Sequence, residues 1–133
     1  MIYYNNKVFK KIIDNKDIKA KILKISDALN KYYNDDKFII LSILHGSIMV
    51  VSDLVKNLKV SYVVDYIELS SYKGTTESSG HIKIINDINL NVKNKKILIV
   101  EDIVDSGRTL NFLYKKLLNM GAEDVKVFSL LFK

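Results

Sequence analysis

The chain has 133 residues, 48% of them hydrophobic, with no cysteine and a formal net charge of +6. This length suits one domain with a core of its own, and the lack of cysteine excludes disulfide and thiolate chemistry and indicates a reducing cytoplasm. No apolar run reaches the length of a membrane span and the first residues lack a signal-peptide layout, so we expect no membrane partner.

The positive charge alone would suit a nucleic-acid-binding protein. Arg108 is the only arginine, however, and the lysines are spread along the whole chain. Arginine is the residue best suited to bidentate contacts with phosphate and guanine. We therefore expect no nucleic-acid partner. The alternative, a nucleic-acid-binding protein, would show strongly salt-dependent binding.

The first half of the chain predicts a helix and then a strand. Residues 15–33 carry apolar side chains at helical spacing, with Asn15 or Asp17 as the expected cap. Residues 38–44, FIILSIL, are apolar except for Ser42, as is typical of strands buried on both faces of a parallel sheet. A second apolar helical face begins at Ile48.

A small turn, His45, Gly46 and Ser47, joins this strand to the second helix. Gly46 admits backbone conformations that a Cβ would forbid, and successive N–H groups in such a turn can hold an anion. A plain capping turn is the alternative, and on these residues alone it is the stronger one.

Residues 61–69 predict another strand, and a polar stretch with two glycines follows over 70–80, with Tyr72 as its one hydrophobic anchor. A loop of this length in a small domain is either disordered or a functional lid. Residues 81–86 then predict a returning strand.

The stretch that dominates the sequence is residues 96–110, KILIVEDIVDSGRTL. Its apolar part, 97–100, predicts another buried parallel strand. Glu101 and Asp102 follow at the strand's carboxyl end, which is where ligands bind in open α/β sheets. These neighbouring acids repel each other, and a bound divalent cation or a row of sugar hydroxyls would relieve that repulsion.

The second part of this stretch leads into a helix. Backbone N–H groups at a helix start lack intrahelical partners, and the helix dipole there favours an anion. Gly107 lets the backbone approach such an anion, while Ser106 and Thr109 supply hydroxyls. The order suits a ligand with a phosphate at one end and hydroxyls or a metal at the other. The alternative is an ordinary cap at Asp105 or Ser106 after a solvated acidic turn.

The rest of the chain repeats the alternation. Apolar residues from Leu110 to Met120 form a helix face, Gly121 lies where a C-terminal glycine is expected, and residues 125–132 predict a strand. The predicted fold is α/β, a mostly parallel twisted sheet flanked by helices, in one domain over residues 1–133.

The run VEDIVDSGRTL resembles the phosphoribosyl-pyrophosphate (PRPP) binding signature of type I phosphoribosyltransferases. Among these enzymes it is most similar to the hypoxanthine-guanine branch. The resemblance implies that family's core fold and a purine-salvage reaction. In that reaction hypoxanthine or guanine and PRPP give IMP or GMP and pyrophosphate, with Mg²⁺ as the metal. Family members are usually dimers or tetramers, so the resemblance also implies a homo-oligomer.

The resemblance also implies roles for individual residues. Glu101 and Asp102 would orient the ribose hydroxyls and the Mg²⁺, directly or indirectly. Asp105 would act on the purine N7 as general base or electrostatic partner. The 5′-phosphate would be held at the helix start, by Asp105, Ser106, Gly107, the backbone of Arg108, and Thr109.

Three further matches follow the same family pattern. The turn at His45, Gly46 and Ser47 corresponds to the pyrophosphate loop, acting through backbone groups. Ser71 and Tyr72 correspond to the catalytic pair in a flexible loop that closes over the transition state and excludes water. Lys133 falls where the family has the lysine that binds the 6-oxo group of the 6-oxopurine base.

Family members continue past the position of Lys133 with a strand and a segment that caps the purine, and we expect this C-terminal purine cap to be missing. A non-catalytic or decayed PRPP-binding module is therefore the alternative function. An uncovered sheet edge would also expose backbone and apolar surface, which predicts lower stability or self-association.

Overall fold

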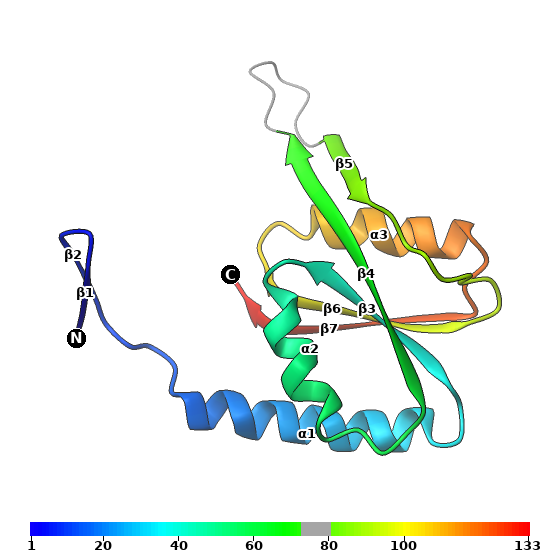
Figure 1. Ribbon diagram of the computed structural model, residues 1–133, viewed down its shortest axis with the longest axis horizontal. Coiled ribbons are helices and arrows are strands. Elements are labelled where there is room, and N and C mark those ends of the chain that lie inside the picture. The colour runs from blue at the N-terminus through cyan, green and yellow to red at the C-terminus, as the bar shows by residue number, and fades with distance from the viewer. Residues whose placement is uncertain (73–80) are drawn as a thin grey trace.

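The computed structural model describes residues 1–72 and 81–133 (Figure 1). A twisted five-stranded sheet lies at its centre, in the order β5-β4-β3-β6-β7. Four strands run parallel: β3 (Phe38–Leu44), β4 (Tyr62–Tyr72), β6 (Lys96–Val104) and β7 (Asp124–Phe132). The edge strand β5 (His81–Asn86) is antiparallel to β4. The sheet confirms the predicted fold class.

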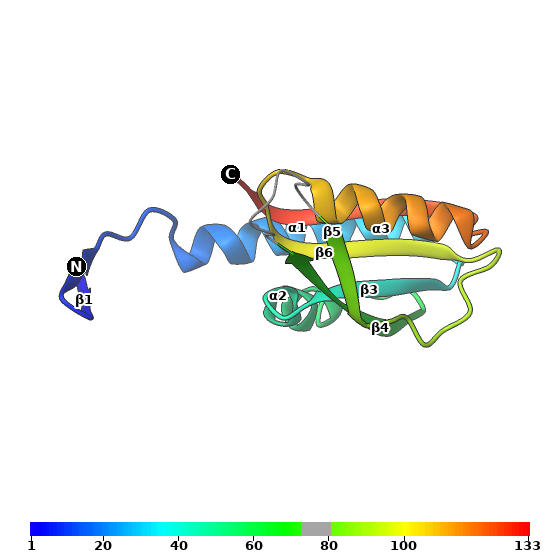
Figure 2. The same ribbon diagram turned by 90° about the horizontal axis from the view of Figure 1, so that it is seen from above.

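Helices cover both faces of the sheet. The helices α1 (Asn15–Tyr33) and α2 (Ser47–Val55) lie on one face and α3 (Arg108–Asn119) on the other (Figures 1 and 2). None of the helices in residues 1–72 and 81–133 is long and apolar enough to span a membrane.

The side chains of β6 alternate between two separate apolar clusters. Leu98 and Val100 pack with residues of α1 and α2, whereas Ile97 and Ile99 pack with Leu113 and Leu117 of α3. This alternation is the ordinary period of two in a strand, and it explains why the run over 97–100 is apolar at every position.

The ends of several elements differ from the sequence predictions. Asp14, rather than Asn15 or Asp17, caps α1, because its carboxylate accepts the N–H of Lys16 at 3.3 Å. The strand β6 continues beyond Val100 to Val104, because pairing with β7 extends it. Glu101 and Asp102, which we predicted to follow the strand, therefore lie within it.

The first 13 residues, for which the sequence predicted no element, form a hairpin and a connecting segment. The strands β1 (Ile2–Tyr4) and β2 (Lys7–Phe9) pair antiparallel. The hairpin lies apart from the sheet, beyond the amino end of α1 (Figures 1 and 2), and every residue of this segment is exposed. The hairpin therefore takes no part in the central core.

Tyr33 carries a buried hydroxyl group in the cluster under α1. Its side chain is 1% exposed and its ring stacks on Phe38 with centroids 3.8 Å apart. The hydroxyl has no hydrogen-bond partner among the described residues, and burial raises the pKa of Tyr33. A buried hydroxyl without a partner lowers stability because it has lost its bonds to water.

We expect Tyr33→Phe to raise the free energy of unfolding by about 1 kcal/mol, because the ring stacking stays while the desolvated hydroxyl is removed. Urea denaturation measures the change. Tyr32→Phe is the matched control, since Tyr32 is exposed and its hydroxyl donates to Asp124 at 2.8 Å. The free energy of unfolding of this variant should not rise. A lower midpoint for Tyr33→Phe would contradict the prediction.

Candidate active site

Two parallel strands part at the carboxyl edge of the sheet. The last paired residues of β3 and β6 are Ser42 and Val100, and beyond them β6 continues to Val104 beside β7 alone. The strand β3 instead ends at Leu44 and turns into α2. Because β3 and β6 separate after this pair, a space opens between them at the carboxyl edge of the sheet.

A pocket of about 240 Å³ lies at this opening. Its apolar lining comes from the ends of three strands, and its polar lining comes from Glu101 and from the start of α3. The lining residues are Ile43, Leu44, Leu69, Glu101, Ile103, Val104, Asp105, Ser106, Gly107, Arg108, Thr109 and Leu110. The structure thus brings together most of the residues that the signature predicted.

The start of α3 offers unused backbone donors to this pocket. Gly107 is the N-cap, in a left-handed conformation with φ 79°, and it makes no side-chain cap hydrogen bond. The predicted alternative, a cap by Asp105 or Ser106, is therefore wrong. The Arg108 amide donates to Ser106 Oγ at 3.4 Å, while the amides of Ser106, Gly107 and Thr109 donate to no other described residue. An anion can bind at such donors.

The two adjacent acids of β6 lie close to each other, and Asp102 also lies against the 45–47 turn. A Cβ added at Gly46 would sit 2.1 Å from Asp102 Oδ2, so this carboxylate lies directly against the glycine. Burial, followed by the neighbouring carboxyl group of Asp102, raises the pKa of Glu101 to about 7. The site therefore disfavours two negative charges when it holds no ligand.

These two acids fit an Mg²⁺ that is shared with a ligand. Among the described residues no group of three or more metal-binding side chains comes together. Mg²⁺ commonly keeps several waters and takes one or two carboxylates together with phosphate oxygens, rather than an all-protein cage. Glu101 and Asp102 supply that number of carboxylates. Burial, and then the neighbouring carboxyl group of Asp102, raise the pKa of Glu101, and a bound cation would favour the ionised form of both groups.

We expect Glu101→Gln to stabilise the ligand-free protein at high pH only. The carboxyl pKa rises from 4.5 to about 7 on folding. The contribution of Glu101 to stability is therefore greatest below 4.5 and is lost as pH rises through 7. The variant should be more stable by about 1–2 kcal/mol at pH 8, allowing for solvent screening, and equal to the parent near pH 4. Urea denaturation across pH, without Mg²⁺, measures this; a difference independent of pH would contradict it.

The turn after β3 presents backbone rather than side-chain groups. The hydroxyl of Ser47 is buried, lies 2.6 Å from Ser42 Oγ and donates to the carbonyl of Ile43. It is therefore held by β3 and not offered to a ligand. In the part of the chain that the structure describes, the amides of Gly46 and Ser47 donate no hydrogen bond. The family resemblance implies that the backbone groups of His45, Gly46 and Ser47 hold the pyrophosphate, and that role stays a prediction.

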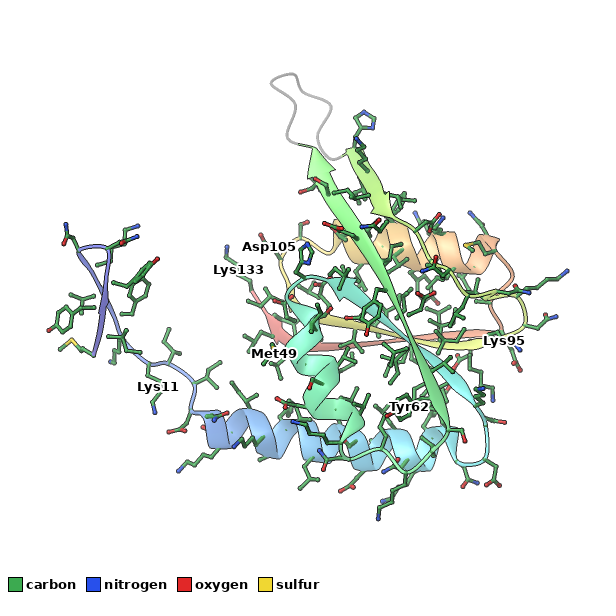
Figure 3. The ribbon with its side chains drawn as sticks, viewed as in Figure 1. Lys11, Met49, Tyr62, Lys95, Asp105 and Lys133 are labelled. Carbon is green, nitrogen blue, oxygen red and sulfur yellow. The ribbon has the colours of Figure 1, made fainter. Side chains whose placement is uncertain are left out.

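Lys133 lies next to Asp105. The Nζ of Lys133 is 4.0 Å from Asp105 Oδ2, and both side chains are exposed at the same end of the sheet (Figure 3). The amide of Lys133 donates to the carbonyl of Val104 at 3.0 Å, which continues the β6–β7 pairing. Of the two residues that we predicted to contact the purine, Asp105 lines the pocket and Lys133 lies beside Asp105.

Ser71 and Tyr72 end β4 rather than begin a loop, since they pair with Ile82 and His81 of β5. Ser71 is exposed. The side chain of Tyr72 and residues 73–80 lie outside the described residues, so the predicted lid and catalytic pair stay predictions.

Sequence reasoning missed the apolar side of the pocket and one acid near it. Leu69 and Ile103 line the pocket, and Glu68 lies 3.0 Å from the ring of His45. The signal that could have found them is the shared carboxyl edge of parallel strands, since β4 and β6 both end beside β3. Using this signal requires the strand order, which the sequence did not give.

Comparison with known proteins agrees with this geometry. The sequence model of the phosphoribosyl transferase domain matches residues 9–133. The hypoxanthine-guanine phosphoribosyltransferase of Lactococcus lactis is 39% identical over 93% of this chain and 67% of its own length. That of Bacillus subtilis is 34% identical over 93% of this chain and 69% of its own, and that of Streptococcus pyogenes is 35% identical over 86% and 63%.

Solved structures give the same result. A hypoxanthine phosphoribosyltransferase from Staphylococcus aureus has a TM-score of 0.83 and 34% identity over 89% of this chain and 64% of its own. A hypoxanthine-guanine phosphoribosyltransferase from Bacillus anthracis has a TM-score of 0.88 and 28% identity over 96% and 75%. The chain spans about two thirds of the length of the curated relatives it matches. The chain therefore belongs to the phosphoribosyltransferase domain family, in its hypoxanthine-guanine branch.

Proposed function

We propose that this chain transfers the phosphoribosyl group of PRPP to hypoxanthine or guanine, forming IMP or GMP and releasing pyrophosphate. The observation that carries the proposal is the pocket that Glu101 of β6 lines together with the start of α3, where backbone amides are unused. Asp102 is the neighbour of Glu101 and lies against Gly46 of the 45–47 turn. This arrangement matches a ligand with sugar hydroxyls and a 5′-phosphate.

Each part of the site would act on one part of the reactants. The amides and hydroxyls of residues 106–109 hold the 5′-phosphate, and Glu101 and Asp102 orient the ribose hydroxyls. The amides of the 45–47 turn hold the pyrophosphate. The bond from C1′ to the pyrophosphate oxygen breaks as the bond from C1′ to the purine nitrogen forms. Asp105 accepts a proton at N7 or stabilises the charge there, while Lys133 donates to the 6-oxo group.

Mg²⁺ bound by Glu101 and Asp102, directly or through water, would neutralise charge on the leaving pyrophosphate. The residues 71–80 would exclude water from the ribosyl centre, which has oxocarbenium character in the transition state. Water exclusion by these residues is carried over from the family resemblance.

The direct test follows nucleotide formation by the purified chain with PRPP, Mg²⁺ and hypoxanthine or guanine. We expect IMP or GMP and pyrophosphate in equal amounts. PRPP that raises the melting temperature without any product would favour the PRPP-binding module instead. Neither product nor a thermal shift would contradict both functions.

Self-association is a separate part of the proposal. The strand β7 is an edge of the sheet, and its exposed apolar residues include Phe132, which is 79% exposed. An edge strand of this kind favours pairing with another copy. We expect sedimentation to show a homo-oligomer whose fraction rises with concentration; a monomer at all concentrations would contradict this. A cytoplasmic setting stays a prediction from composition.

A further inference from the structure

Two consecutive hydrogen bonds connect the 45–47 turn to the neighbouring strands β4 and β5. The Nε2 of His45 lies 3.0 Å from Glu68 Oε1, and the other carboxylate oxygen of Glu68 accepts the Asn86 side-chain amide at 2.7 Å. A carboxylate only accepts hydrogen bonds, so Nε2 is the protonated nitrogen in this pair. Glu68 is 20% exposed and the ring of His45 is 75% exposed. Glu68 is therefore the more buried residue of this pair, although its side chain is still partly exposed.

The backbone places Glu68 where it can make both contacts. In the parallel pairing of β3 with β4, Glu68 is the partner of Leu44, the residue just before His45. On the other side it pairs with Asn86 of β5, and the register of that ladder shifts between Glu68 and Leu69. A shift of this kind bends the strand and re-aims a side chain. The irregularity coincides with the one acid on this strand that contacts the turn.

We propose that Glu68 is a positioning residue for the pyrophosphate group, acting through His45; this rests on the proposed function. The hydroxyl of Ser47 anchors the end of the turn to β3, because it bonds to Ser42 and to the carbonyl of Ile43. Glu68 of β4 anchors the start of the turn through the ring of His45. The amides of Gly46 and Ser47 are therefore aligned before the ligand binds, so binding costs less conformational entropy.

The pyrophosphate group is present in PRPP as well as in the product, so loss of alignment weakens the ground state and the transition state alike. We expect Glu68→Leu to raise the KM for PRPP and the Kd for Mg²⁺-pyrophosphate about five- to tenfold, with kcat within twofold. Glu68→Gln keeps an acceptor for His45, and its amide can bond to Asn86 once that side chain turns over. This conservative variant should therefore stay within about threefold of the parent.

Three further variants make the test specific. His45→Ala should raise the pyrophosphate Kd by a similar factor, and the double variant with Glu68→Leu should be no worse than either single variant. Asp87→Asn is the matched control, because Asp87 is next to Asn86 but pairs with Lys116 of α3 at 3.4 Å; it should leave both constants unchanged. Thermal melts check that each variant is folded.

The measurement of Mg²⁺-pyrophosphate binding by calorimetry separates this inference from the proposed function. If the parent chain does not bind pyrophosphate, the proposed function fails. If the parent binds and folded Glu68→Leu binds equally well, only the positioning role fails. A loss in Glu68→Gln as large as in Glu68→Leu, or additive effects in the double variant, would also overturn the positioning role.

Discussion

Asp105→Asn is expected to lower kcat by about 100-fold or more while PRPP binding stays within about threefold. Asp105 lies in the pocket on the segment between β6 and α3, beside Lys133 and away from the apolar core. Asparagine keeps the size of the side chain and one of its two acceptor oxygens. It cannot accept a proton from the purine, nor offset positive charge there, so the loss should fall on the chemical step.

Steady-state nucleotide formation gives kcat, and calorimetric titration with PRPP gives the affinity. Ser106→Ala is the matched control on the same segment: it removes a hydroxyl predicted to hold the 5′-phosphate, so it should weaken PRPP binding and change kcat little. Equal losses of turnover and of PRPP affinity in Asp105→Asn would instead show that Asp105 has a structural role.

Gly46→Ala is expected to lower kcat/KM by about 100-fold with little effect on folding. The added Cβ would lie 2.1 Å from Asp102 Oδ2 and 2.6 Å from Asp102 Cγ, so the carboxylate has to move. Asp102 can rotate away because the conflict is with the end of its side chain and not with the backbone. The movement takes the carboxylate from the place where it would orient the ribose and the metal.

Gly121→Ala separates this effect from ordinary glycine strain. Gly121 has a φ of 87° and lies after α3, where an added Cβ would be 3.2 Å from the side chain of Lys93. Alanine there should lower the free energy of unfolding by about 1 kcal/mol and leave the kinetics unchanged. If Gly46→Ala behaved like Gly121→Ala, with lost stability and full activity, Asp102 would not need its present position.

The central elements could be predicted from the sequence because their residues leave few alternatives. Short apolar runs rich in isoleucine, such as 38–44 and 97–100, are typical of strands covered on both faces, and α1 has the predicted bounds. The signature predicted the polar half of the pocket because residues 101–109 are consecutive and lie at one strand end. Local sequence order was sufficient there.

What could not be predicted depends on contacts between distant residues. The strand β6 includes Glu101 and Asp102 because β7 pairs with it as far as Val104. The residues around Glu101 do not by themselves indicate that the strand continues. The pair of His45 and Glu68 depends on the register of β3 against β4, and the contact of Gly46 with Asp102 depends on β3 lying beside β6. Neither register can be read from one strand.

The two apolar clusters lie on opposite faces of the sheet, and only Ile43, Leu69 and Leu110 of one cluster also line the pocket. Most of the buried surface that stabilises the protein is therefore separate from the positions that would choose the ligand. A lineage carrying this scaffold can exchange side chains at the rim, and so acquire a different base preference, without first acquiring compensating changes in its interior.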